Sequence, residues 1–290
     1  MNPREFEYHA PHSLDEAFSL LGKYGDESKI LAGGQSLIPL MKSRIFSMPH
    51  IIDIGKIEGL RNIEINKSGA RIGSLVTISD LESEHEIAEL FPAIHDAASQ
   101  IADPLIRNAG TIGGNIAHGD PGNDLPAVLV TLGAVFVLRR SGGERTADAS
   151  KFFIDTLETD VHHGEILTEI VIPRPGKKTA SAYLKAKKSA GDFSIAGIST
   201  CISMEKDGSI GSIRMALTSS GPKVIEVTGL EEICKGKKDY NSIAEKVSVA
   251  AVSSAKPSDD FYGTVQYKKK VIGILAKDCL KLAMERAEKR

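Results

Sequence analysis

The 290-residue sequence predicts an α+β protein with a two-lobed N-terminal domain and a smaller α+β domain after it. Short apolar strands alternate with helical segments up to about residue 175. The segment Pro173-Arg174-Pro175-Gly176 then interrupts regular structure. Beyond it strands come first and helices follow, an order typical of α+β domains. We therefore expect domains at residues 1–175 and 178–290, and lobes of the first domain at about residues 1–58 and 59–175.

The first lobe is expected to alternate strands and helices. A capping box, Ser13-Leu14-Asp15-Glu16, begins an amphipathic helix that continues to about Tyr24. The pair Gly33-Gly34 ends the second strand. In order, the expected elements are a strand at 5–9, this helix, a strand at 29–32, a helix near Pro39 and a strand at 51–54.

The second lobe is expected to contain two hairpins, a helical region and a closing strand. Asn66-Lys67-Ser68-Gly69 and Gly142-Gly143 have the composition of hairpin turns. In order, we expect strands at 63–65 and 70–72, a helical region at 78–101 interrupted near Phe91-Pro92, a glycine-rich stretch, a helix at 128–132, and strands at 135–139, 145–147 and 166–172.

The C-terminal domain is expected to place three strands before two helices. The strands lie near residues 181–186, 195–204 and 213–218, and the helices at about 242–255 and 262–290. Apolar residues at helical spacing predict a core or interface face on the last helix. These residues are Val271, Ile274, Leu275 and Leu282.

Composition and charge exclude several classes of partner. The net charge of −2 and the pI of about 6.5 argue against wholesale binding to nucleic acid or to an anionic membrane. No apolar stretch approaches the ~18 to 20 residues that span a bilayer, and the N-terminus has no apolar signal core. We therefore expect a cytoplasmic protein without a membrane span. Three lysine clusters are expected to be solvated faces: Lys185, Lys187 and Lys188; Lys235, Lys237 and Lys238; Lys268, Lys269 and Lys270.

The sequence shows no metal or catalytic motif of its own. Cys201, Cys234 and Cys279 lie far apart without a CxxC pair, so they are expected to be buried or inert thiols rather than ligands of zinc or an iron–sulfur cluster. His162-His163-Gly164 is expected to be an exposed loop. We find no Ser-His-Asp or Cys-His arrangement, which fits a protein whose difficult chemistry belongs to a cofactor.

Two glycine-rich segments, each expected to form a loop, are the main candidates for a binding site. Paired glycines let consecutive backbone N–H groups approach a phosphate, and Ser36, Thr111 and Asn115 can add side-chain hydrogen bonds. The alternative for each segment alone is a tight turn. A Rossmann GxGxxG motif and a GxxxxGK[ST] P-loop are both missing. The first segment comprises Ile30, Leu31, Ala32, Gly33, Gly34, Gln35, Ser36 and Leu37, and the second runs from Asn108 to Pro121.

These segments carry a resemblance to a known family. AGGQSLIPLMK at residues 32–42, followed by RNAGTIGGNIAHGDPGNDLPA at residues 107–127, resembles the paired FAD motifs of the medium subunits of molybdenum hydroxylases of the carbon monoxide dehydrogenase and xanthine dehydrogenase type. EILTEIVIPRP at residues 165–175 and YLKAKKSAGDFSIAGIS at residues 183–199 are also similar to that family. The resemblance implies a two-lobed FAD-binding domain, with the flavin in the crevice between the lobes.

The resemblance also implies roles for individual residues. The first segment would line the pyrophosphate and adenosine of FAD, and Thr111, Gly113, Gly114 and Asn115 would hold the pyrophosphate from the other side. Ile101 and Leu167 match apolar positions that pack against the cofactor. Asp124 matches an acidic position that hydrogen-bonds a cofactor hydroxyl, and Lys185 a position that reaches toward the flavin. Phe193, in the Asp192-Phe193 loop, stands where an aromatic ring can cover the flavin.

Three of the candidate residues have a structural alternative. Asp120 and Asp124 can be Asx-turn residues beside Pro121 and Gly122, and His118 can cap backbone groups instead of contacting a cofactor.

The function that the resemblance implies is electron transfer through FAD. The partners would be a molybdopterin-containing large subunit and a small subunit with [2Fe–2S] clusters, and the acceptor would be NAD, a quinone or oxygen. The alternative is a self-sufficient FAD-dependent reductase of the UDP-N-acetylenolpyruvoylglucosamine reductase type. That enzyme would need a substrate pocket and a proton donor on this chain, and the sequence offers no convincing candidate.

Overall fold

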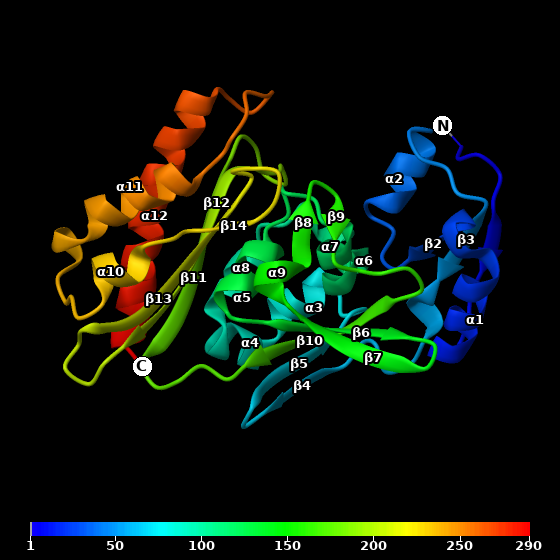
Figure 1. The fold of residues 1–290 in the computed structure, drawn as a ribbon, viewed down its shortest axis with the longest axis horizontal. Helices are drawn as coiled ribbons and strands as arrows, with labels where there is room; N and C mark the ends of the chain where they lie inside the picture. Colours follow the sequence, from blue (N-terminus) through cyan, green and yellow to red (C-terminus); the bar gives the residue numbers. More distant parts are fainter. Residues whose placement is uncertain (1) are drawn as a thin grey trace.

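The computed structural model describes residues 2–290 and arranges them in three parts, each with its own sheet (Figure 1). The first lobe lies at one end, the second lobe in the middle and the C-terminal domain at the other end. The chain leaves the sheet of the second lobe at Pro173 and enters the next sheet at Thr179. The predicted α+β class is confirmed.

The first lobe is a three-stranded parallel sheet with two helices. Ser13 caps α1 as predicted, because its Oγ accepts a hydrogen bond from the Glu16 N–H at 3.2 Å. The Glu16 carboxylate accepts from the backbone N–H of His12 at 2.8 Å, so the returning bond of the capping box is displaced by one residue. The strand order is β1 (Glu7–His9), β3 (His50–Asp53), β2 (Ser28–Leu31), and the other elements are α1 (Leu14–Tyr24), η1 (Gly25–Glu27), α2 (Leu37–Lys42) and η2 (Ile54–Lys56).

The second lobe is a five-stranded antiparallel sheet covered by short helices (Figure 1). Ile170 on the central strand pairs with Ile72 on one side and Phe136 on the other, and all three are fully buried. Both predicted hairpins are present. The strand order is β4 (Ile63–Asn66), β5 (Gly69–Gly73), β10 (Ile166–Pro173), β6 (Val135–Arg140), β7 (Gly143–Asp148), with a ribbon of β8 (Phe153–Asp155) and β9 (Glu158–Thr159). The helices are α3 (Ile78–Ser83), α4 (His85–Leu90), α5 (Pro92–Ala98), α6 (Pro104–Ala109), α7 (Ile112–His118), α8 (Leu125–Thr131) and α9 (Ala149–Phe152).

Two predictions for the second lobe are wrong in detail. The helical region at 78–101 is divided into three helices and ends at Ala98. The extra break falls at Glu84, whose backbone is extended and whose side chain caps α4. The glycine-rich stretch at 108–121 is not a continuous loop, since α7 begins at Ile112. Thr111 starts this helix because its side chain accepts a hydrogen bond from the Gly114 N–H.

The C-terminal domain packs helices on an antiparallel sheet, as predicted. Of the four residues predicted to face the core or an interface, Val271, Leu275 and Leu282 are partly buried and pack against the domain core, whereas Ile274 is 57% exposed. Small residues take the inner positions because the neighbouring elements are close; a Cβ on Gly273 would lie 2.8 Å from Ser248 Oγ. The strand order is β11 (Thr179–Lys187), β12 (Ser194–Met204), β13 (Ile210–Thr218), β14 (Ile225–Glu226), and the helices are α10 (Leu230–Cys234), η3 (Tyr240–Ser242), α11 (Ala244–Ser254) and α12 (Val265–Glu288). The fully buried residues of α12 include Ile272, Ala276, Cys279, Leu280 and Ala283.

Two lysines of the predicted solvated clusters are buried instead. Lys268 Nζ lies 2.6 Å from Asp260 Oδ2, and Lys185 forms an ion pair with Asp124 that is described below. In both cases an acidic partner offsets the cost of removing the ammonium group from water. Within residues 2–290, no helix has the length and apolar character that a membrane crossing requires.

The three cysteines lie in separate elements of the C-terminal domain. Burial raises the pKa of Cys279 to about 12, and it raises the pKa of Cys201 and Cys234 to about 11. All three thiols therefore stay protonated at neutral pH, where a protonated thiol is a poor nucleophile and a poor metal ligand. The prediction of buried, inert thiols is confirmed for Cys234 and Cys279, whereas Cys201 is half-buried.

Candidate functional site

The first glycine segment follows β2 and leads into α2. Gly34 has a φ of +73°, which glycine adopts without strain. Among residues 2–290, the backbone N–H groups of Gly33, Gly34, Gln35 and Ser36 have no hydrogen-bond acceptor. Such a run of unpaired donors at a turn is suited to an anion. Ile30 and Leu31 lie on β2, Ala32 follows it, and Leu37 is the first residue of α2.

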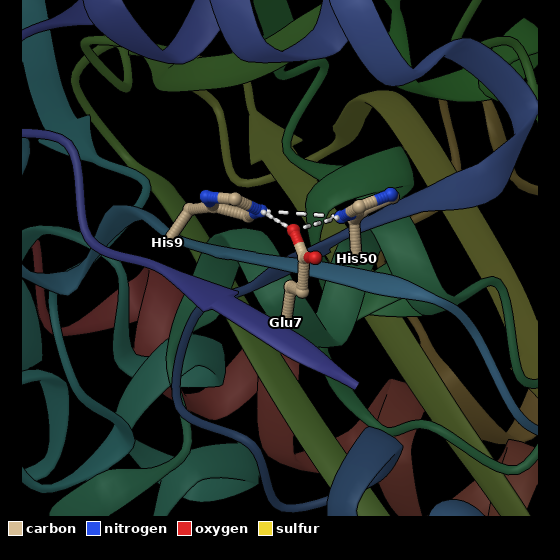
Figure 2. A group of neighbouring side chains, drawn as sticks. All are labelled: Glu7, His9 and His50. Atoms are coloured by element: carbon tan, nitrogen blue, oxygen red, sulfur yellow. Dashed lines mark hydrogen bonds and ion pairs between the residues drawn. The ribbon is translucent and has the colours of Figure 1, made fainter. Parts of the chain in front are cut away.

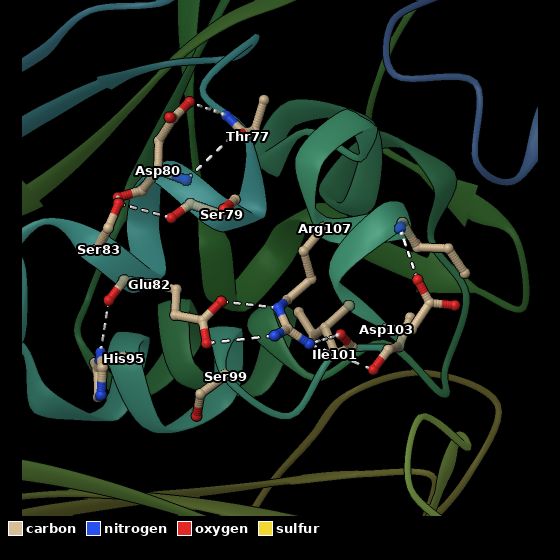
Figure 3. Close-up of polar contacts among 12 residues, drawn as sticks. Thr77, Ser79, Asp80, Glu82, Ser83, His95, Ser99, Ile101, Asp103 and Arg107 are labelled. Carbon is tan, nitrogen blue, oxygen red and sulfur yellow. Dashed lines mark hydrogen bonds and ion pairs between the residues drawn. The ribbon is translucent and has the colours of Figure 1, made fainter.

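The start of the second glycine segment, which runs from residue 108 to residue 121, is held in place by Arg107 on α6. Its Nε donates to Glu82 Oε2 on α3 at 2.8 Å, and its Nη1 donates to the carbonyl of Ile101 at 3.1 Å (Figure 3). Thr77 and Asp80 form a capping box at the start of α3, and Asp103 caps α6, so both helices that carry this ion pair begin at a capped end. The sequence analysis assigned no role to Arg107, although it is the first residue of the second motif, or to Glu82, because their ion pair joins positions 25 residues apart.

The two glycine segments touch through their backbones. A Cβ built on Gly33 would lie 2.0 Å from the carbonyl oxygen of Ala109 and 2.9 Å from the Cα of Gly110. A Cβ built on Gly110 would lie 3.7 Å from Gln35 Cγ, so this residue also lies against the first segment. Only glycine at position 33 therefore permits this approach, which confirms that the segments lie side by side.

A crevice of about 240 Å³ opens between the first lobe and the second at this contact. Among the described residues of its lining, Arg61 alone is cationic, and its Nη2 donates to the Gly55 carbonyl at 3.1 Å. Sequence reasoning did not identify Arg61, because it lies between the motifs and carries no pattern of its own. The lining comprises Ala32, Gly33, Arg61, Leu75, Thr77, Asn108, Ala109 and Thr111.

Gly113 and Gly114 occupy the first turn of α7, and neither has a positive φ. Their N–H groups are already paired, Gly113 with the Ser74 carbonyl at 2.9 Å and Gly114 with Thr111 Oγ1 at 3.1 Å. Gly113 serves close packing, because a Cβ there would lie 2.4 Å from Ser74 Cβ. The buried Oδ1 of Asn115 has no partner within residues 2–290, which leaves an acceptor for a ligand donor.

Beyond α7, the chain forms a second group of predicted site residues. His118 is the last residue of α7, and its Nε2 lies 3.8 Å from Asp120 Oδ2. Burial lowers the pKa of His118, and Asp120 opposes that shift. Asp120 Oδ1 accepts from the Gly122 N–H at 2.8 Å, so Asp120 is an Asx-turn residue. Because α7 separates this group from the crevice by roughly 10 Å of helix, the predicted residues form two groups rather than one cluster.

Asp124 lies at the contact between the second lobe and the C-terminal domain. It accepts hydrogen bonds from Tyr183 Oη at 2.5 Å and from Lys185 Nζ at 2.8 Å, and all three side chains are almost fully buried. Burial raises the pKa of Asp124, and Lys185 and Tyr183 oppose that shift. Burial, followed by the charge of Asp124, raises the pKa of Tyr183 well above its usual value. Asp124 is therefore not a turn residue.

The remaining predicted residues surround this second group. Phe193 is 52% exposed, and its Cδ1 would lie 2.9 Å from a Cβ on Gly122. The Lys185 ammonium also donates to the Gln100 carbonyl at 3.3 Å, next to Ile101. Ile101 packs on the core of the second lobe, and Leu167 is buried within that core.

Comparison with known protein families gives the same assignment over both domains. Residues 4–175 match the model described as FAD binding domain in molybdopterin dehydrogenase. Residues 181–283 match the model described as CO dehydrogenase flavoprotein C-terminal domain.

Individual relatives match over nearly the whole chain. The carbon monoxide dehydrogenase medium chain of Hydrogenophaga pseudoflava is 39% identical over 99% of both chains. A solved structure of carbon monoxide dehydrogenase from that organism matches with a TM-score of 0.95 and the same coverage. The glyceraldehyde dehydrogenase medium chain of Sulfolobus acidocaldarius is 33% identical over 97% of this chain and 99% of its own length.

The residues in and beside the crevice fit FAD. The unpaired N–H groups and Arg61 suit a pyrophosphate, and the orphaned Asn115 Oδ1 suits a hydroxyl or amide donor. The backbone contact at Gly33 holds the two glycine segments side by side. The chain belongs to the family of FAD-binding medium subunits of molybdenum hydroxylases, which are oxidoreductases, and its cofactor is FAD.

Proposed function

We propose that this chain is the electron-transfer subunit of a molybdenum hydroxylase, and that it takes electrons from [2Fe–2S] clusters of a small partner subunit. A molybdopterin-containing large subunit would hydroxylate the substrate, and NAD, a quinone or oxygen would accept the electrons. Relatives named for carbon monoxide and for glyceraldehyde both match this chain over almost its full length. This supports a division of labour in which another subunit selects the substrate.

The observation that carries the proposal is the run of unpaired N–H groups from Gly33 to Ser36 beside the crevice. We infer that these groups and Arg61 hold the FAD pyrophosphate, and that Asn115 accepts a hydrogen bond from the cofactor. When bound, FAD supplies the redox chemistry, since a flavin exchanges electrons singly or in pairs. The chain contributes binding and orientation, and none of its acidic or basic side chains is required to move a proton.

Electron transfer can be tested with the purified FAD-loaded chain and its small subunit. The small subunit is first reduced and separated from the reductant, and the two proteins are then mixed. We expect rapid loss of visible flavin absorbance, because the partner surface brings the clusters close to the flavin. An unrelated reduced ferredoxin at equal concentration is the control, and it should react more slowly. A flavin that stays oxidised in the presence of the reduced small subunit, yet responds to chemical reductant, would contradict the proposal.

The alternative is a self-sufficient FAD-dependent reductase of the UDP-N-acetylenolpyruvoylglucosamine reductase type. An activity assay on the purified FAD-loaded chain distinguishes the two functions. Turnover of that enolpyruvyl substrate with a reduced nicotinamide by this chain alone would favour the alternative. We expect none, since the described residues that line the 240 Å³ crevice include neither a carboxylate nor an imidazole.

Arg61→Gln is expected to weaken FAD binding about tenfold or more. The substitution removes one charge-assisted hydrogen bond, worth roughly 1.5 to 3 kcal/mol, and 1.4 kcal/mol corresponds to a factor of ten. Fluorescence titration of the apoprotein with FAD measures the dissociation constant. Arg139→Gln is the matched control, because Arg139 pairs with Glu144 on an exposed hairpin away from the crevice. Equal affinity in wild type and Arg61→Gln would remove Arg61 from the site.

A further inference from the structure

The edge of the first-lobe sheet carries a cluster of Glu7, His9 and His50 that the FAD site does not use. Strands β1 and β3 are parallel, and Glu7 is the register partner of His50. His9 lies two residues after Glu7, so its side chain is on the same face of the sheet. The pairing of two strands thus brings together two imidazoles and a carboxylate from opposite ends of the lobe's sequence.

The ligand atoms of these three residues point toward one another (Figure 2). His9 Nε2 lies 3.2 Å from His50 Nδ1, His50 Nδ1 lies 3.3 Å from Glu7 Oε2, and His9 Nε2 lies 3.9 Å from the same oxygen. A tetrahedral zinc ion with bonds of about 2.0 to 2.1 Å has neighbouring ligands roughly 3.3 Å apart. Two of the three separations match this value, and a small rotation of the exposed Glu7 side chain adjusts the third.

The surroundings hold the rings in place and leave one side open. The Tyr24 ring stacks on His50 at 3.7 Å and on His9 at 4.9 Å between ring centres. The two imidazoles are mostly buried, with 19% and 14% of their side chains exposed, whereas Glu7 is 69% exposed. Two fixed nitrogens and a movable carboxylate make a three-ligand site whose fourth position is open to water.

We propose that Glu7, His9 and His50 bind a divalent transition-metal ion of the zinc class. Imidazole nitrogen combined with carboxylate oxygen favours such ions over Mg²⁺ or Ca²⁺, which prefer oxygen ligands alone. The bound ion links the edge strand β1 to the central strand β3 of the lobe that carries the first glycine segment. The cluster without metal would instead be a chain of hydrogen bonds between the two rings and the carboxylate, and experiment distinguishes these states.

The test is calorimetric titration of ZnCl₂ into the FAD-loaded, tag-free protein after treatment with chelator. We expect uptake of one ion per chain. His9→Gln and His50→Gln are each expected to weaken binding at least about tenfold, because the loss of a direct ligand exceeds the 10- to 100-fold effect of losing an outer-shell partner. His12→Gln is the matched control, since His12 is exposed three residues away and outside the cluster, and it should leave the affinity unchanged.

Retention of FAD by each variant shows that its fold is intact. Glu7→Gln is an additional variant, and it is milder because Glu7 lies at an exposed position. Zinc is also expected to raise the melting temperature of wild type, and to leave that of the His9→Gln/His50→Gln double variant unchanged. Absence of saturable one-to-one uptake would overturn the proposal. Uptake that persists in the folded double variant would do the same, because the ion would then bind elsewhere.

Discussion

Gly33→Ala is expected to weaken FAD binding at least about a hundredfold. The new Cβ would lie 2.0 Å from the Ala109 carbonyl oxygen, and no side-chain rotation can relieve a clash between two backbone segments. The segments must separate, which moves the N–H groups of residues 33–36 away from the pyrophosphate. Loss of two charge-assisted hydrogen bonds of roughly 1.5 to 3 kcal/mol each corresponds to a factor of at least about 100 in affinity.

Gly22→Ala is the matched control for this substitution. Gly22 lies in α1 of the same lobe, and a Cβ there would meet no atom within 4 Å. The control should retain FAD affinity and gain roughly 0.5 to 1 kcal/mol in stability, since alanine is the better helix former. FAD titration and thermal unfolding of both apoproteins provide the measurement. A folded Gly33→Ala protein with wild-type FAD affinity would exclude this contact from the cofactor site.

Gly114 is less critical in the structure than its place in the glycine motif suggests. It lies within α7 without a positive φ, and a Cβ there would meet Thr111 Oγ1 at 2.9 Å and Ala32 Cβ at 3.8 Å. Alanine at this position disturbs one side-chain hydrogen bond at the start of the helix, whereas alanine at Gly33 separates two backbones. We therefore expect the larger loss of FAD at position 33.

Lys185→Met is expected to lower the free energy of unfolding by about 3 to 5 kcal/mol, the cost of leaving one member of a buried ion pair alone. Asp124 would keep only Tyr183 as a partner at the contact between the second lobe and the C-terminal domain. Lys246→Met, at an exposed position of α11 in the same domain and without an ion pair in the described structure, is the control. A loss below about 1 kcal/mol would show that the ion pair is a minor contact.

The destabilisation of Lys185→Met should grow with pH. Burial already raises the pKa of Asp124 in the folded state, and removal of Lys185 removes the strongest opposing contribution. A carboxyl whose pKa is higher folded than unfolded costs no stability in acid, where both states are protonated. The cost appears as pH rises from the unfolded pKa through the folded one. Chemical unfolding of variant and wild type near pH 5 and pH 8 measures this; a constant difference would contradict it.

Several features could be predicted from the sequence because their causes are local. The hairpin at Asn66–Gly69, the cap at Ser13 and the strands on either side of the break at Pro173 depend on turn chemistry and periodicity over a few residues. The two glycine segments could be identified for the same reason, since each pattern is contiguous. The start of α7 at Ile112 was missed because its capping residue, Thr111, lies inside a glycine-rich run that also suits a loop.

Tertiary structure decided which of these residues meet. Lys185 pairs with Asp124 across 61 residues, and His9 meets His50 across 41, in both cases because neighbouring strands or domains bring distant positions together. The contact between Gly33 and Ala109 depends on how two lobes pack, and no pattern near either residue specifies it. The sequence by itself therefore determined the α+β elements and the two segments suited to FAD. Packing alone determined that one segment supplies free N–H groups, that the other supplies close contact, and that a histidine pair faces a carboxylate at the edge of the first lobe.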